Sequence, residues 1–210
     1  MRLRWILAPT LLLAVACNLL TPLALFVEPR KNVAPEFDKL PGKKVAVLVW
    51  TEPATLFDYP HTRFELATYI GDKLYTELGR REAGTTIVDP RDVEDFVQKT
   101  PSAQLDPYAV GEKFDADYVV YLEVLQFQLR DPNAPQFHRG RIEASESVYD
   151  VRGDASTQRR YDLITARCEY PDEAPVALTA TNAPLVREAT YRKFAETVAR
   201  KFYEHTIKDS

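Results

Sequence analysis

The 210-residue chain is poor in glycine, and this shortage argues against a nucleotide-binding protein. Its seven glycines never cluster. A nucleotide-binding α/β sheet places glycines directly after its first strand, so that backbone N–H groups can approach the phosphate. After Trp50, which ends the first expected strand, the stretch TEPAT at 51–55 contains no glycine. We therefore expect no nucleotide site and no bound cofactor.

Histidine is also scarce, and the three residues His61, His138 and His205 are scattered over two expected loops and the last expected helix. A metal site needs several histidine, cysteine or carboxylate ligands that converge. A hydrolase triad needs an exposed nucleophile beside a histidine, and the Gly-x-Ser-x-Gly motif of such enzymes is missing. The sequence therefore predicts no metal site and no catalytic residue, and we expect a protein that is not an enzyme.

An excess of positive charge is absent as well. From Glu28 onward the chain carries 25 basic and 31 acidic side chains. Neutralisation of phosphates by lysine and arginine supplies most of the affinity of nucleic-acid-binding proteins, so we expect no nucleic-acid partner. The hydrophobic share of 45% instead indicates a globular domain with a substantial core.

Charge is missing altogether between Trp5 and Val27, behind a basic start at residues 1–4. In one interpretation, residues 3–16 are the apolar part of a signal peptide, and LAVAC at 13–17 resembles a bacterial lipobox, in which Cys17 becomes the lipidated N-terminus after cleavage. In another, residues 5–27 form an uncleaved transmembrane helix, because about 20 apolar residues span a bilayer. Plain secretion after cleavage is the third. The first two predict a membrane-anchored, extracytoplasmic protein.

The second cysteine, Cys168, has no partner within the chain if Cys17 is lipidated. It lies in an alternation of polar and apolar residues at 161–168 that is typical of a strand. We expect a small, buried strand residue there and not a reactive thiol.

Residues 28–42 contain three prolines and mixed charge, which is typical of a tether, and residues 43–210 are predicted to form one extracytoplasmic domain. Lys44–Trp50 and Asp117–Val124 are apolar runs typical of strands buried on both faces. Strands alternate with helices in the first half, which favours parallel pairing. The fold class predicted is α/β, a single domain with a mixed, mostly parallel sheet and flanking helices. A C-terminal antiparallel hairpin at 139–170 and a long helix at about 183–207 complete it.

Three helix starts carry capping signals. Thr62 and Glu65 have the spacing of a capping box before an apolar stripe that runs to Leu78. Asp89 and Asp106 each precede a proline, the arrangement of an N-cap followed by proline at the first helical position. A bulge or a change of exposure is expected near Ser147, where the alternation changes face.

Several of these segments together resemble a known group of proteins. They are the opening strand KVAVLVW at 44–50, the stretch TIVD at 86–89, the phrase GEKFDADYVV at 111–120 and the turn SVYD at 147–150. The order is similar to that of the periplasmic α/β domain of bacterial envelope lipoproteins, a group that includes CsgG, LpoB and the N-terminal domain of TolB. Uncharacterised lipoproteins with a phrase like APEF at 34–37 are more similar still. The resemblance implies the fold and the envelope compartment.

A binding surface is expected at the loop 51–61, which follows the carboxyl end of the first strand, where open α/β sheets usually bind ligands. Leu56, Phe57, Asp58 and Tyr59 are the candidate partner-binding residues, and the loop 131–138 is expected beside them. An equal expectation is that these rings simply cover the edge of the sheet. The function predicted is a non-enzymatic binding or assembly module of the cell envelope that contacts an envelope protein or itself. The alternative is an extracytoplasmic enzyme or small-ligand-binding protein without a known motif.

Overall fold

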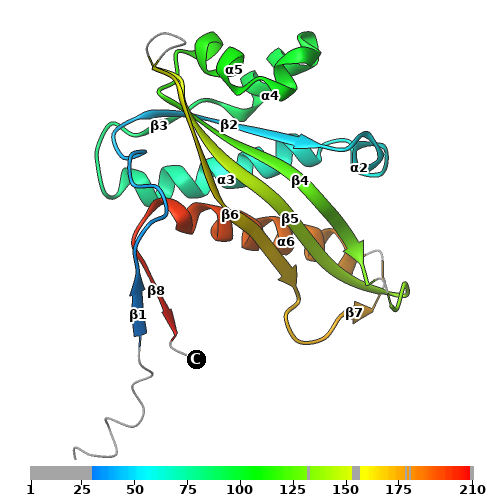
Figure 1. Ribbon diagram of the computed structural model, residues 1–210. Helices are drawn as coiled ribbons and strands as arrows, with labels where there is room; N and C mark the ends of the chain where they lie inside the picture. The colour runs from blue at the N-terminus through cyan, green and yellow to red at the C-terminus, as the bar shows by residue number, and fades with distance from the viewer. Residues whose placement is uncertain (1–29, 132, 153–156, 178, 180, 209–210) are drawn as a thin grey trace, which may run out of the picture. The chain divides into compact units, whose positions relative to one another are not determined.

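The structure is a computed structural model that describes residues 30–131, 133–152, 157–177, 179 and 181–208 (Figure 1). Two compact units are present. The smaller contains strands β1 (Arg30–Val33) and β8 (His205–Lys208), which pair antiparallel with Val33 opposite His205. The larger, residues 34–204, holds all the other elements. Cys17 and the rest of the expected leader lie outside the described residues.

The larger unit is built on a six-stranded sheet in which β3 (Thr86–Ile87), β2 (Lys44–Thr51), β4 (Tyr118–Arg130), β5 (Phe137–Asp150) and β6 (Arg159–Tyr170) follow one another across the sheet. The short strand β7 (Val176–Ala177) pairs with the start of β5. Only the pairs β2–β3 and β2–β4 are parallel; β4–β5, β5–β6 and β5–β7 are antiparallel.

The expectation of a mostly parallel sheet is therefore wrong, although the sheet is mixed and the antiparallel hairpin β5–β6 is present. The physical reason lies in the connections. Parallel neighbours need a long crossover, and only the chain up to β4 supplies helices for one. From β4 to β6 each strand turns back directly into the next, so these strands can pair only antiparallel, and β7 runs in the direction of β6 and pairs antiparallel with β5.

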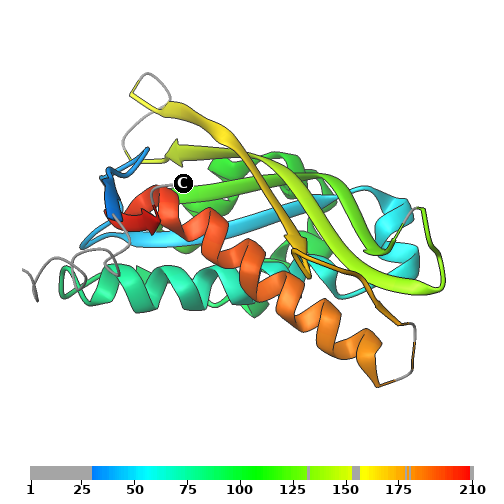
Figure 2. The same ribbon diagram turned by 90° about the horizontal axis from the view of Figure 1, so that it is seen from below.

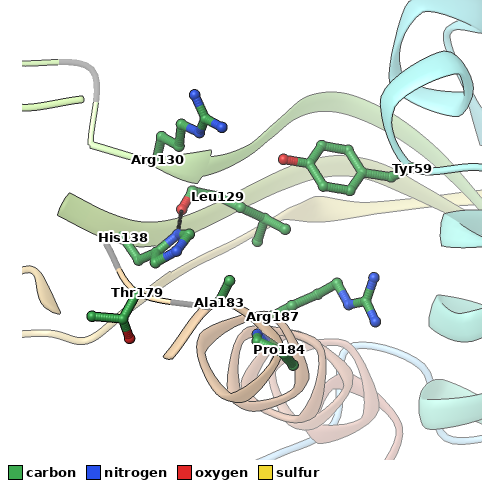
Figure 3. A pocket seen from close by; sticks show the side chains of 8 residues that line it. All are labelled: Tyr59, Leu129, Arg130, His138, Thr179, Ala183, Pro184 and Arg187. Carbon is green, nitrogen blue, oxygen red and sulfur yellow. Dashed lines mark hydrogen bonds between the residues drawn. The ribbon is translucent and has the colours of Figure 1, made fainter. Parts of the chain in front are cut away.

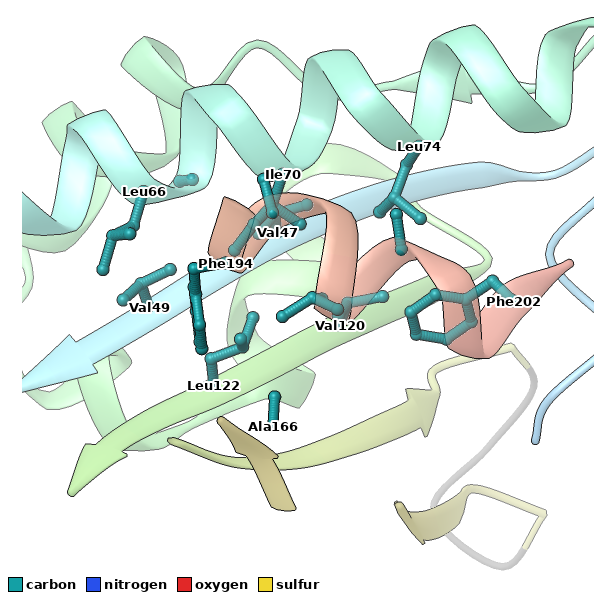
Figure 4. Packing of buried hydrophobic residues seen from close by; sticks show 14 of the residues in the cluster. Val47, Val49, Leu66, Ile70, Leu74, Val120, Leu122, Ala166, Phe194 and Phe202 are labelled. Carbon is teal, nitrogen blue, oxygen red and sulfur yellow. The ribbon is translucent and has the colours of Figure 1, made fainter. Parts of the chain in front are cut away.

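Helices cover both faces of the sheet (Figures 1 and 2). One face packs against α3 (Thr62–Gly79) and α6 (Asn182–Ala199), and Figure 4 shows Leu66 of α3 lying over Val49 of β2 and Ile70 over Val47. The other face packs against α4 (Pro90–Lys99), the 3₁₀ helix η1 (Pro101–Leu105) and α5 (Pro107–Phe114). Strand β2 lies between two neighbours and is buried from Val45 to Val49, as its apolar run predicts.

The capping signals in the sequence predicted two helix starts correctly and the third one wrongly. The Asp89 carboxylate accepts a hydrogen bond from the Arg91 N–H at 2.8 Å, and Asp106 accepts one from Ala109 at 3.1 Å, as expected of N-caps. The capping box is wrong. Thr62 is already helical and fully buried, and its hydroxyl lies 3.2 Å from the Tyr191 hydroxyl of α6.

Three further boundaries differ from the sequence-based expectations. The last helix ends at Ala199 and is followed by the 3₁₀ helix η2 (Arg200–Phe202), in which Phe202 is 1% exposed. The expected loop 51–61 contains a short helix, α2 (Pro53–Asp58). Within the expected tether, Phe37 and Leu40 are buried in the core of the larger unit, so the folded chain begins before residue 43.

Candidate functional site

Two adjoining cavities lie where α2, the β4–β5 connection and the start of α6 meet. The first, which we call the α6 cavity, has a volume of about 600 Å³. Its wall consists of Tyr59, Leu129, Arg130, His138, Thr179, Ala183, Pro184 and Arg187. The second, the α2 cavity, has about 710 Å³ and is lined by Asp58, Tyr59, Phe127, Gln128, Leu129, Arg130, Asp131 and Pro135. Figure 3 shows Tyr59, Leu129 and His138 on one side of the α6 cavity and Ala183, Pro184 and Arg187 on the other.

The four candidate residues of the 51–61 segment take different positions around these cavities. Tyr59 borders both cavities and Asp58 borders the α2 cavity. Phe57 is 88% exposed, whereas Leu56 is half-buried and lines neither cavity. The expected neighbouring loop, 131–138, supplies Asp131, Pro135 and His138. Folding thus brings together the two loops that the sequence pointed to, and their role in binding stays a prediction.

A chain of aromatic rings fixes α2 against the core. The Tyr59 ring meets Phe127 of β4 edge to face, with centroids 5.1 Å apart, and Phe127 lies 5.9 Å from Tyr191 of α6. Tyr191 is buried, and this burial raises the pKa of its hydroxyl. Because such ring pairs are worth about 0.5–1.5 kcal/mol each, they hold Tyr59 in place at the cavity edge.

The β4–β5 connection is held by the Asp131 carboxylate. It accepts hydrogen bonds from the N–H groups of Asn133 at 2.9 Å and Ala134 at 3.2 Å, and Arg139 Nε lies 3.6 Å away. The carboxylate is 11% exposed, so its charge is largely engaged within the turn. This local network positions the strand residues on either side of the turn.

His138 is the most enclosed polar residue of the α6 cavity and is 6% exposed. Its Nδ1 lies 3.0 Å from the Leu129 carbonyl oxygen. A carbonyl only accepts, so Nδ1 carries a proton. The other ring nitrogen, Nε2, is buried and has no hydrogen-bond partner among the described residues.

Two arginines border the α6 cavity from different elements, Arg130 of β4 and Arg187 of α6, and Figure 3 shows the Arg130 guanidinium turned away from α6. Sequence reasoning missed both. Arg130 directly precedes the predicted 131–138 loop, and its position at the end of a strand could have indicated that it borders the site. No local signal exists for Arg187, because only tertiary packing brings a residue on α6 to a loop about fifty residues earlier in the chain.

Other polar groups singled out from the sequence lie elsewhere. Cys168 is buried on β6, as expected of a strand residue, and burial raises the pKa of its thiol to about 12. His61 is the N-cap residue of α3 and His205 belongs to β8. Within the part of the chain that the structure describes, no group of three histidine, cysteine or acidic side chains is arranged to hold a metal ion.

No protein-family model and no curated protein matches the chain. Among solved structures, similar chains include the PelC dodecamer from Paraburkholderia phytofirmans, with 9% identity over 80% of this chain and 96% of that one and a TM-score of 0.45. The lipoprotein GNA1162 from Neisseria meningitidis has 14% identity over 71% and 95% of the two chains and a TM-score of 0.39. The hypothetical protein CT253 from Chlamydia trachomatis has 14% identity over 75% and 96% and a TM-score of 0.40. At these values the likenesses transfer no property to this chain.

Across the described residues, no helix combines the length and the apolar character that crossing a membrane requires.

Proposed function

We propose that this protein is a membrane-anchored, extracytoplasmic binding module of the bacterial cell envelope and that the two cavities beside α2 are its partner-binding site. The anchor and the compartment are supported by the N-terminal sequence alone, through its uncharged stretch and the lipobox-like Cys17. The binding role is supported by the two cavities of the larger unit.

The observation that carries the binding role is the convergence of three separate segments on one concave surface. Tyr59 comes from the end of α2, Arg130 from the end of β4 and Arg187 from α6. Phe57, two residues from Tyr59, presents an 88% exposed ring. Aromatic and arginine side chains dominate the energetics of protein interfaces, and an exposed phenylalanine beside a cavity fits that role.

We propose binding in preference to catalysis. The cavity wall offers Thr179 as a hydroxyl and the unpartnered Nε2 of His138 as a base, but no hydrogen bond joins these two side chains among the described residues. A nucleophile needs a base within hydrogen-bond reach for activation.

Capture of partners from native membranes tests the proposal. The full chain, with its anchor, is isolated after cross-linking as wild type, as Phe57→Ala and as Tyr75→Ala. Tyr75 is a matched control because it is an aromatic residue on α3 that is 59% exposed. We expect a partner that is lost from Phe57→Ala and kept by Tyr75→Ala. A partner kept equally by both variants would place binding elsewhere, and a wild type that captures nothing would refute the binding role.

A further inference from the structure

A groove lies between α3 and β3, the strand at one edge of the sheet (Figure 1). Its volume is about 470 Å³. One wall is a stripe of α3 residues, Phe64, Thr68, Gly71, Asp72 and Tyr75. The other wall comes from β3 and the first residues of α4. None of these residues lines the α6 cavity or the α2 cavity, so this α3–β3 groove is a separate surface.

The backbone of Ile87 points out of the sheet at this edge. The Thr86 N–H donates to the Lys43 carbonyl oxygen at 3.0 Å, and the next N–H but one, that of Val88, donates to the Val45 carbonyl oxygen at 2.9 Å. Both N–H groups therefore point toward β2, and those of Ile87 between them point away. Within the described residues, no strand lies on that side of β3 and neither backbone group of Ile87 makes a hydrogen bond. An unpaired strand edge of this kind can accept an added strand.

The side chain opposite Ile87 in an added strand would face α3. Ile87 itself faces this helix, because a Cβ added to Gly71 would lie 3.2 Å from Ile87 Cγ2. Directly opposed residues of paired strands place their side chains on the same face of a sheet. The residue that pairs with Ile87 would therefore extend over the α3 wall, which carries Asp72 and Tyr75.

The charge on this wall is a carboxylate without a partner. Asp72 is exposed and makes no ion pair with a described residue. Tyr75 is 59% exposed, so its ring is open to contact. The opposite wall adds Asp89 and Arg91, which leaves the groove with an excess of negative charge. A lysine or arginine side chain fits these groups, because its apolar stem can cover the tyrosine ring while its charged end reaches the carboxylate.

We propose that the α3–β3 groove binds an extended segment of a second protein, which pairs with the Ile87 backbone as an added strand and directs a lysine or arginine toward Asp72. The unpaired N–H and C=O groups favour an extended segment, and the excess of carboxylates favours a basic one. The proposal goes beyond the proposed function, because it assigns a second partner surface outside the two cavities.

A defined peptide tests the chemistry of the groove. The probe is the acetylated and amidated pentapeptide Thr-Val-Arg-Val-Thr, whose β-branched residues favour an extended backbone. The full chain in phosphatidylcholine nanodiscs is titrated with it, and binding is followed by the NMR shifts of the Gly71 and Ile87 amides. A second peptide has norleucine in place of arginine, which keeps an apolar stem and removes the charge. We expect the arginine peptide to bind about tenfold more tightly, because hydrogen bonds between charged groups are the strong ones.

Methylation of the peptide backbone tests strand addition itself. A methyl group on the N–H of the central arginine removes the hydrogen bond to the Ile87 carbonyl oxygen, whereas a methyl group on the N–H of either valine faces away from β3. We expect the first change to weaken binding at least about tenfold and the second to alter it by less than about threefold. Equal sensitivity at both positions would show that the peptide does not pair with β3, and would overturn the proposal.

Variants of the protein assign the charge preference to Asp72. Asp72→Asn should weaken binding of the arginine peptide about tenfold and leave that of the norleucine peptide unchanged. Asp95→Asn is the matched control, because Asp95 is exposed on α4 and does not line the groove. Asp72→Lys should reverse the preference, so that a peptide with central glutamate binds better than the arginine peptide. An arginine peptide that does not bind, or that binds Asp72→Asn and Asp95→Asn equally well, would refute the proposal.

Capture from membranes separates the groove from the two cavities. In the cross-linking experiment, a protein bound at the groove should be lost from Tyr75→Ala and Asp72→Lys and kept by Phe57→Ala, the opposite of the pattern expected for the cavities. If only a cross-linked dimer of this chain is lost from Asp72→Lys, the occupant is a second copy and the proposal of a second protein is wrong. If Asp72→Lys loses nothing, the groove is not a partner surface. The proposed function would survive either result, because its own test follows a partner that depends on Phe57.

Discussion

Lys201 of η2 forms an ion pair with Glu146 of β5, with Nζ 2.9 Å from Oε2, and both side chains are almost completely enclosed, at 7% and 0% exposure. Lys201 also donates to the Ile164 carbonyl oxygen, and its own carbonyl accepts from the N–H groups of Glu36 and Phe37. Glu36 in turn accepts from the Ile164 N–H at 2.9 Å. The pair therefore ties the start and the end of the larger unit to the β5–β6 bulge between Ala144 and Glu146.

We predict that this pair makes the protein less stable as pH rises through neutrality. Burial raises the pKa of Glu146 from its ordinary value of 4.5 to about 7, against the opposing charge of Lys201. The folded protein then binds more protons than the unfolded chain between these values. The stabilising contribution is present below about 4.5 and is lost as pH rises through about 7.

Urea unfolding of wild type and Glu146→Gln at about pH 5 and about pH 8 measures this contribution. We expect the free energy of unfolding of the wild type to fall by up to about 3 kcal/mol relative to the variant over this range. Glutamine does not titrate, so the variant lacks the pH-dependent contribution of Glu146, although it also removes the partner of Lys201. Parallel pH dependence of the two proteins would contradict the prediction.

A second prediction concerns the approach of β5 to α6. A Cβ added to Gly140 would lie 1.9 Å from Thr190 Oγ1 and 2.7 Å from Thr190 Cβ. Thr190 cannot move freely, because it is buried and its hydroxyl donates to the Val186 carbonyl oxygen. Gly140→Ala should therefore lower the free energy of unfolding by about 1–3 kcal/mol, as overpacking does. Gly79→Ala, where an added Cβ meets nothing within 4 Å, is the control and should be neutral or stabilising.

A third prediction separates the N-cap that forms from the capping box that does not. Asp89→Ala removes the hydrogen bond to the Arg91 N–H and should cost about 1 kcal/mol of stability. Glu65→Ala removes no cap, since α3 begins at Thr62 with no side-chain cap hydrogen bond, and should stay within about 0.5 kcal/mol of wild type. Thermal unfolding of both variants checks this. An equal loss of stability in both variants would show that Glu65 does act in a capping box.

The anchor gives a fourth prediction. If Cys17 is lipidated, Cys17→Ser blocks acylation, because attachment needs a thiol, and leaves the precursor unprocessed at its full mass. The wild-type membrane form should instead have lost residues 1–16 and gained the mass of a lipid. An uncleaved helix would tolerate serine. Intact mass spectrometry of both membrane forms distinguishes the two anchors, and a full-length, unmodified wild type would exclude lipidation.

Local sequence patterns determined much of this fold. The apolar run at 44–50 predicted the buried strand β2, and Asp89 and Asp106 marked two helix starts, because these signals act over a few neighbouring residues. Residue order also pointed to the segments 51–61 and 131–138 as one surface, since both follow the ends of strands.

Only the tertiary structure decided the rest. The balance of parallel and antiparallel pairing depended on which strands meet across the sheet. Thr62 became a partner of Tyr191 and not a cap because α6 packs against α3. Arg187 reaches the cavity, and Lys201 reaches Glu146, through contacts between residues dozens of positions apart in the chain. A local sequence pattern does not predict such contacts, because they form and stabilise the fold only when the separate elements pack together.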